Sequence, residues 1–163
     1  MQIFVIDYVP EQAAAMLCDV HLRKMCLETA QILSAVLYTK NLELQSGMPQ
    51  PYNCRHPVIA ALDTPAKINW TLLHNLALHR EYFRRFGKYH AFSPLADSYT
   101  KMLFSPETSL QKEYLSFARN FKNMTILEPD IVKAYRIYYR YKKRVMRRWH
   151  YTNAAEPQWL TAF

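Results

Sequence analysis

Residues 19–40 read DVHLRKMCLETAQILSAVLYTK, and this stretch decides the fold. Its apolar and small residues return every three or four positions, which predicts one long amphipathic helix with a buried face. The predicted buried face consists of Leu22, Met25, Cys26, Thr29, Ile32, Leu33 and Val36. Beside it runs a polar stripe formed by His21, Lys24, Glu28 and Gln31. A glutamate at the border of a core is either a catalytic carboxylate or ordinary helix surface.

The residues around this stretch predict more helices and an all-α fold. Residues 1–8 are β-prone, but no second strand pattern follows, so we expect an extended and packed N-terminal arm. Pro10 and Pro57 suit the first turns of two short helices, and Asp19 suits the cap of the long one. A second long helix is predicted between a Thr64-Pro65 start and a stop at Gly87.

The second long helix is also amphipathic. Its predicted core stripe is Ile68, Leu72, Leu76, Phe83 and Phe86, and its predicted outward residues are His74, Glu81, Arg84 and Arg85. Further helices are predicted over residues 93–104 and 130–149. Residues 105–125 are ambiguous, with helical spacing at 110–121, and the last fourteen residues are predicted to be irregular and anchored by Trp159.

Length and composition limit the class of protein. The chain has 163 residues, which fits one compact helical domain over residues 1–163. Gly47 and Gly87 are its two glycines, so the Gly-rich turns of most nucleotide-dependent enzymes are excluded. Three cysteines suit reduced thiols. Because neither a leader pattern nor a long apolar run is present, we expect a cytoplasmic protein (in the host cytoplasm if it is viral) without membrane association.

Positive charge is concentrated near the C-terminus. The net charge is +8, and residues 129–151 hold eight lysines and arginines against one acidic residue, Asp130. Five positions step along one helix face: Lys133, Arg136, Arg140, Lys143 or Arg144, and Arg147. This pattern, interleaved with Tyr138, Tyr139, Tyr141 and Trp149, predicts contact with a nucleic-acid backbone and bases. The alternatives are a solvated surface helix and an anionic membrane surface.

Cysteine and histidine also form two pairs that suggest zinc. Cys18 with His21 and Cys54 with His56 offer suitable ligands, but their spacings fit structural zinc sites poorly. We therefore expect no metal and no other cofactor. For His56 the alternative to a catalytic role is a histidine that ends a loop and hydrogen-bonds the next helix.

The order of these residues resembles pyrimidine-dimer DNA glycosylases, the phage endonuclease V type and its bacterial relatives. Asp19, His21 and Leu22 match the Asp-x-His-Leu that opens the family's early helix, and Glu28 falls on its catalytic glutamate. The bacterial relatives share a basic residue at Lys24, the run from Glu28 to Leu33, and an Asn/Arg-His-Pro motif like Arg55-His56-Pro57. The resemblance covers roughly residues 1 to 90.

The resemblance implies a single helical DNA-glycosylase-like domain that acts on double-stranded DNA carrying a damaged or modified pyrimidine. An N-terminal α-amino group attacks the sugar C1′ and expels the base, and the resulting imine permits β-elimination. Catalytic roles would fall on Glu28, Met1, His21 and His56. Lys24, Arg23 and Arg55, with Lys133, Arg136, Arg140, Lys143, Arg144 and Arg147, would bind DNA around a flipped nucleotide. We expect a monomer.

Two departures from the phage enzyme leave alternatives open. In that enzyme the initiator methionine is removed and the amine of the following threonine is the nucleophile. Here the second residue, Gln2, is bulky, so we expect Met1 to be retained, and the nucleophile is Met1 itself or is absent. Arginines that flank the family's glutamate are Leu27 and Gln31 here. The alternative functions are transfer of an amine or amino acid to an activated hydroxymethylpyrimidine in phage DNA, and nucleic-acid binding without catalysis.

Overall fold

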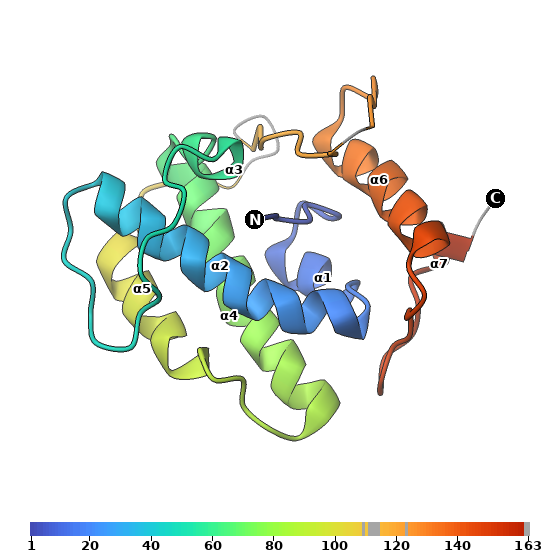
Figure 1. Cartoon of the computed structure of the whole chain (residues 1–163), viewed down its shortest axis with the longest axis horizontal. Coiled ribbons are helices and arrows are strands. Elements are labelled where there is room, and N and C mark those ends of the chain that lie inside the picture. The colour runs from blue at the N-terminus through green and yellow to red at the C-terminus, as the bar shows by residue number, and fades with distance from the viewer. Residues whose placement is uncertain (109, 111–114, 123, 162–163) are drawn as a thin grey trace.

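The computed structural model describes residues 1–108, 110, 115–122 and 124–161 and is built from helices (Figure 1). In chain order they are α1 (Pro10–Ala15), α2 (Asp19–Thr39), α3 (Pro57–Ala60), α4 (Pro65–Phe86), η1 (Ser93–Leu95), α5 (Ala96–Leu103), α6 (Ile131–Val145) and α7 (Gln158–Thr161). The described residues contain no strand, which confirms the all-α prediction. None of their helices combines the length and apolarity that crossing a membrane requires.

The long helix α2 forms as predicted. It runs from Asp19 to Thr39, and all seven residues of its predicted core face are buried. The predicted cap is wrong, because Cys18 occupies the N-cap position and makes no side-chain cap bond. Asp19 is instead the first helical residue, and its carboxylate accepts hydrogen bonds from Thr152 and Arg85. This carboxylate therefore ties α2 to α4 and to the C-terminal segment.

Helix α4 begins and ends where the sequence predicts. Thr64 Oγ1 accepts from the backbone N–H of Lys67 at 3.4 Å, and Gly87 stops the helix with a left-handed φ of 64°. Helices α1, α2 and α5 all pack against α4, which lies behind α2 in Figure 1. Because α4 is covered from several sides, residues on most of its faces are buried, and not only those of the predicted core stripe.

The predicted outward side of α4 is therefore mostly wrong. Arg84 is exposed as expected, but His74, Glu81 and Arg85 are buried, and Phe83 from the predicted core stripe is 43% exposed. The side chain of Arg85 is fully buried between two carboxylates, with Asp19 Oδ1 at 3.1 Å and Glu81 Oε1 at 2.6 Å. It also donates to the carbonyls of Ala15 and Leu17. Paired in this way, a buried charge is tolerated.

The N-terminal arm is extended and packed, as predicted. Ile3, Phe4, Val5 and Ile6 are buried. The ring of Phe4 lies 4.6 Å from the ring of His21 on α2 and 5.1 Å from that of Tyr139 on α6. The arm is therefore sandwiched between these two helices.

Helix α6 is shorter than predicted. Asp130 caps it by accepting from the backbone of Val132 and Lys133, and it ends at Val145 rather than at Trp149. Beyond it the chain turns back, so that the ring of Trp149 packs on His21 and Tyr139. The predicted spacing at 110–121 falls partly outside the described residues, and 115–121 are not helical. Trp159 anchors the tail as predicted, because its carbonyl accepts from Arg140.

Candidate active site

Glu28 occupies a sheltered position near the middle of α2. Its side chain is 13% exposed, and Oε1 lies 3.3 Å from Lys24 Nζ one turn earlier. Oε2 is buried and has no hydrogen-bond partner among the described residues. An ordinary surface glutamate has both oxygens in water, and a buried oxygen without a donor is energetically costly. This arrangement suits a carboxylate that accepts a proton or a hydrogen bond from a bound molecule.

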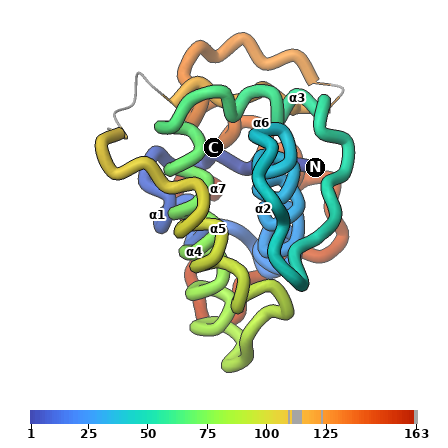
Figure 2. The backbone as a smooth tube through the Cα atoms, turned by 90° about the vertical axis from the view of Figure 1, so that its left-hand side faces the viewer, coloured from blue at the N-terminus to red at the C-terminus, as the bar shows by residue number. Residues whose placement is uncertain are grey.

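The first two residues of the chain are held in place by Asn120. The side-chain amide of Asn120 donates to the Met1 carbonyl at 3.0 Å, and the backbone carbonyl of Asn120 accepts from Gln2 Nε2 at 2.8 Å. Met1 packs partly buried against the core. In two perpendicular views the N-terminus lies beside α2 (Figures 1 and 2). The α-amino group is thus positioned by the fold.

His56 lies close enough to the N-terminal amine and to Glu28 for both charges to influence its pKa. It caps α3, and its Nδ1 accepts from the backbone N–H of Val58 at 3.2 Å, which confirms the loop-ending alternative. The pKa of His56 is lowered, first by burial and then by the positive charge of the N-terminal amine, while Glu28 acts in the opposite direction. Met1 and Glu28 are therefore each within electrostatic range of His56.

His21 is buried beside Tyr139, which corrects its predicted place in the polar stripe of α2, and its catalytic role stays a prediction. It is 4% exposed, and its Nδ1 lies 3.0 Å from the Tyr139 hydroxyl and 3.5 Å from Cys18 Sγ. Burial, with help from Lys142 and Lys24, lowers the pKa of His21 to about 3. His21 is therefore a neutral side chain that packs among the rings of Phe4, Tyr139 and Trp149 at the start of α2.

Positive charge gathers near Lys24. Arg23, Lys24 and Arg55 are exposed, as binding to phosphate requires. The pKa of Lys142 on α6 is lowered by burial and then by Lys122 and Lys24, so three lysines from separate segments share one region. Lys122 and Lys142 were not among the predicted DNA-binding residues. Lys122 lies in the segment 105–125, whose structure is ambiguous from sequence, so no sequence signal placed it there.

The predicted basic stripe on α6 is largely occupied by contacts within the chain. Arg136 donates to the Ile6 carbonyl at 2.8 Å and to Asp7 at 3.0 Å, Arg140 donates to the Trp159 carbonyl, and Lys143 pairs with Glu156 at 2.8 Å. These three residues bind the arm and tail, and their assignment to DNA stays a prediction. The exposed members are Lys133, Arg144 and Arg147.

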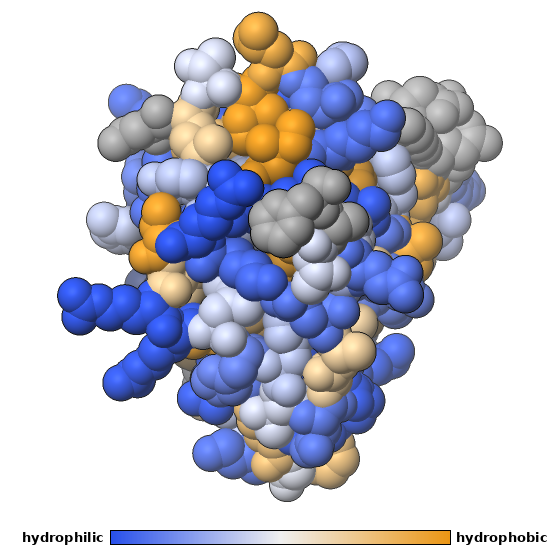
Figure 3. Space-filling model, turned by 90° about the vertical axis from the view of Figure 1, so that its right-hand side faces the viewer, coloured by the Kyte–Doolittle hydropathy of each residue, from blue (hydrophilic) through white to orange (hydrophobic). Residues whose placement is uncertain are grey.

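The aromatic residues of this region are divided in the same way. Tyr138 and Tyr139 are buried in the core, and Trp149 packs on Tyr139, whereas Tyr141 is 42% exposed. The side of the molecule that carries α6 is mostly hydrophilic, with long polar side chains projecting from it (Figure 3). Among the tyrosines of this helix, Tyr141 is therefore the one whose ring is exposed.

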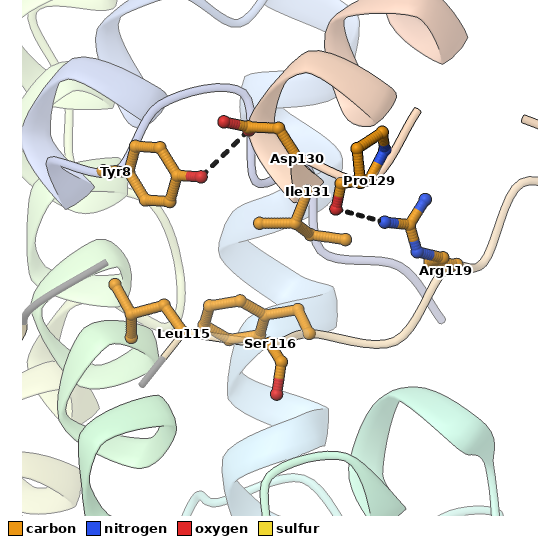
Figure 4. A pocket seen from close by; sticks show the side chains of 8 residues that line it. Tyr8, Leu115, Ser116, Arg119, Pro129, Asp130 and Ile131 are labelled. Atoms are coloured by element: carbon orange, nitrogen blue, oxygen red, sulfur yellow. Dashed lines mark hydrogen bonds between the residues drawn. The ribbon is translucent and has the colours of Figure 1, made fainter. Parts of the chain in front are cut away.

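A pocket of about 470 Å³ lies where the arm meets the start of α6 (Figure 4). The Tyr8 hydroxyl donates to Asp130 at 2.9 Å on one side, and Arg119 donates to the Pro129 carbonyl on the other. None of the predicted catalytic residues lines it. Its hydrogen bonds join the arm to the segment before α6, so we assign it a structural role.

Comparison of the chain with protein-family models, with curated proteins and with solved structures found no match in any of the three. The resemblance to pyrimidine-dimer DNA glycosylases therefore stays a prediction that depends on individual residues.

Proposed function

We propose that the protein is a DNA enzyme that acts on a pyrimidine extruded from a duplex, removing the base as a glycosylase and cleaving the strand as a lyase. The observation that carries this proposal is the sheltered Glu28 carboxylate, whose buried Oε2 has no partner among the described residues. Asn120 fixes Met1, and the charges of the Met1 amine and of Glu28 both influence the pKa of His56. An amine and a carboxylate from distant parts of the chain are the two groups that this chemistry requires.

Each group has a defined part in the proposed reaction. The neutral amine of Met1 attacks C1′, the bond from C1′ to the base breaks, and the base leaves with the electron pair and takes up a proton. Loss of protons from the attached nitrogen and opening of the sugar ring give an imine at C1′. Glu28 stabilises the positive charge that develops on the sugar and transfers these protons. The exposed Lys24 holds one carboxylate oxygen, so the second oxygen faces the reaction.

The lyase step uses the same groups. The imine draws electrons from C2′, a base removes a C2′ proton, and the bond to the 3′ phosphate oxygen breaks. Burial and the neighbouring amine lower the pKa of His56, and its Nδ1 lone pair is used by Val58, so the neutral ring offers its Nε2–H as a donor and Glu28 is the base that accepts the C2′ proton. Water then hydrolyses the imine and regenerates the amine. No cofactor is needed in this scheme.

DNA binding in this proposal comes from the exposed cations around the site. Arg23, Lys24 and Arg55 lie on or next to the elements that carry Glu28 and His56, and Lys122 and Lys142 extend the positive region. Phosphate contacts from such residues give affinity without sequence preference. The extruded base would then be held beside α2.

The proposal is tested by Glu28→Gln with Glu43→Gln as the matched control. Both changes remove one carboxylate, and Glu43 is exposed in the loop after α2. On duplexes with an abasic site or a pyrimidine dimer, we expect Glu28→Gln to lose about 10²–10⁴-fold in rate, as for a general acid–base group. DNA affinity and the rate of Glu43→Gln should stay at the wild-type level.

Two results would overturn the proposal. Wild-type turnover in Glu28→Gln would remove the carboxylate from the mechanism. A gain in nucleoside mass after incubation with hydroxymethylpyrimidine DNA, without base release, would assign the site to a transferase instead.

A further inference from the structure

We propose that Cys26, His79 and His90 form a binding site for zinc or a chemically similar divalent transition-metal ion. One ligand atom from each residue lies within 4.8 Å of the others. Cys26 comes from α2, His79 from α4, and His90 from the loop that follows α4. Thiolate and imidazole are the ligand types that zinc prefers, and this proposal does not depend on the proposed reaction.

His79 is the residue that points most clearly to a ligand. It is 6% exposed, and its Nε2 is buried without a hydrogen-bond partner among the described residues. Its Nδ1 lies 3.1 Å from Ser93 Oγ. If Nδ1 carries the proton and donates it to Ser93, the lone pair of Nε2 is directed at the cluster. Metal-binding histidines are commonly oriented by such a bond on the other ring nitrogen.

Cys26 and His90 complete the set from opposite sides. Cys26 is completely buried and not in a disulfide, so its sulfur is free to bind an ion inside the cluster. His90 is half-buried, and its ring centre is 5.7 Å from that of His79. Its Nδ1 accepts a long bond of 3.3 Å from the backbone N–H of Phe92. Coordination through Nε2 moves the proton to Nδ1 and releases that weak bond.

The spacing requires a small contraction. Tetrahedral zinc with bonds of about 2.0–2.3 Å places its ligand atoms roughly 3.3–3.8 Å apart. The cluster limit of 4.8 Å is therefore wider by about an ångström. His90 is the ligand that can supply this movement, because it lies in a loop and is the least buried of the three.

A pocket of about 370 Å³ adjoins the site at His79. His79 and Ser93 line it, together with the acidic side chain of Asp97. Three protein ligands leave a fourth position, which water from this pocket can fill. The bound ion would join α2, α4 and the loop after it, so binding should stabilise the fold.

The experiment is a titration of the chelator-treated full chain with Co²⁺ in the presence of a reductant that does not bind metal. We expect one Co²⁺ per chain, a thiolate-to-cobalt charge-transfer band, visible bands of a tetrahedral ion, and displacement by Zn²⁺. Zn²⁺ should also raise the Tm. An absent charge-transfer band in the wild-type protein overturns the proposal without any variant.

Variants then assign the ligands. Cys26→Ser should lose the charge-transfer band, and both it and His79→Asn should bind Co²⁺ about 100-fold more weakly or worse. Cys54→Ser is the matched control and should keep both band and affinity. A band that survives Cys26→Ser, or one that disappears in Cys54→Ser, contradicts the assignment. If Cys26→Ser fails to fold by circular dichroism, Cys26→Ala replaces it.

Discussion

Lys24 Nζ lies 3.3 Å from Glu28 Oε1, while Oε2 of the same carboxylate is buried and accepts no hydrogen bond from the described residues. The lysine side chain is 58% exposed and the glutamate side chain 13% exposed. The pair therefore spans the boundary between solvent and the site. In a simple surface pair both partners are in water and the interaction has little effect on stability.

Lys24→Gln should weaken DNA binding without unfolding the protein. An exposed helix pair contributes only about 0.3–0.5 kcal/mol, but the lysine shares a region of positive charge with Lys122 and Lys142. We expect the slope of log affinity against log salt to become shallower by about one unit. Arg80→Gln, which removes an exposed charge from α4, serves as the control. Equal slopes for Lys24→Gln and the wild type would contradict the assignment.

Arg85→Ala should be one of the most destabilising changes in the chain. It leaves the carboxylates of Asp19 and Glu81 without their shared buried partner, which costs about 3–5 kcal/mol. Arg84→Ala removes a neighbouring guanidinium whose side chain is 52% exposed, and should cost less than about 1 kcal/mol. Urea unfolding measures both values. Similar losses for the two variants would refute the network in the structure.

Acid should destabilise the protein through Asp19. Burial alone raises the pKa of this carboxyl, but hydrogen bonds from Thr152 and Arg85 outweigh burial and bring the pKa below its usual 3.8. Because the folded pKa lies below the unfolded one, the contribution is complete above the unfolded pKa and is lost as the pH falls through the folded pKa.

The measurement is the free energy of unfolding between pH 7 and pH 3 for the wild type and Asp19→Asn. His150→Gln should be present in both proteins, so that the contact of 3.2 Å between His150 Nε2 and Asp19 Oδ2 is absent from the comparison. We expect a flatter acid limb in the Asn variant. Parallel curves would show that Asp19 titrates alike in both states.

The basic residues of α6 should separate into two classes. Combined replacement of Lys133, Arg144 and Arg147 by Gln should lower DNA affinity and reduce its salt dependence, because these side chains are exposed. Arg136→Gln and Arg140→Gln should mainly lower the Tm, because they break bonds to the Ile6 and Trp159 carbonyls. Filter binding and thermal melts test both statements. The reverse pattern would instead support the sequence-based assignment of this whole stripe to DNA.

Much of the fold could be predicted because its signals are local. The α2 face follows from apolar spacing, and α4 follows from Thr64, Pro65 and Gly87, whose capping acts within a few residues. The burial of Arg85 could not be predicted, since it depends on Asp19, a residue distant in sequence. The early end of α6 likewise depends on Trp149 packing against α2.

The candidate site shows the same division. Spacing on α2 placed Lys24 and Glu28 on one side of the helix, and Arg55-His56-Pro57 predicted a helix start. The contact of Asn120 with Met1 joins opposite parts of the chain, and nothing in the segment around Asn120 indicated it. Cys26, His79 and His90 lie on three separate elements with no common motif, so their grouping became visible only in three dimensions.

The most direct test of the central claim is borohydride trapping on duplex DNA with an abasic site, followed by peptide mass spectrometry of the adduct. Reduction converts an imine into a stable bond and so marks the nucleophile. We predict one DNA adduct per chain, located on the α-amino group of Met1 and absent when that group is acetylated. No adduct across the pH range in which an α-amino group titrates, or an adduct on a lysine such as Lys24, would contradict the account.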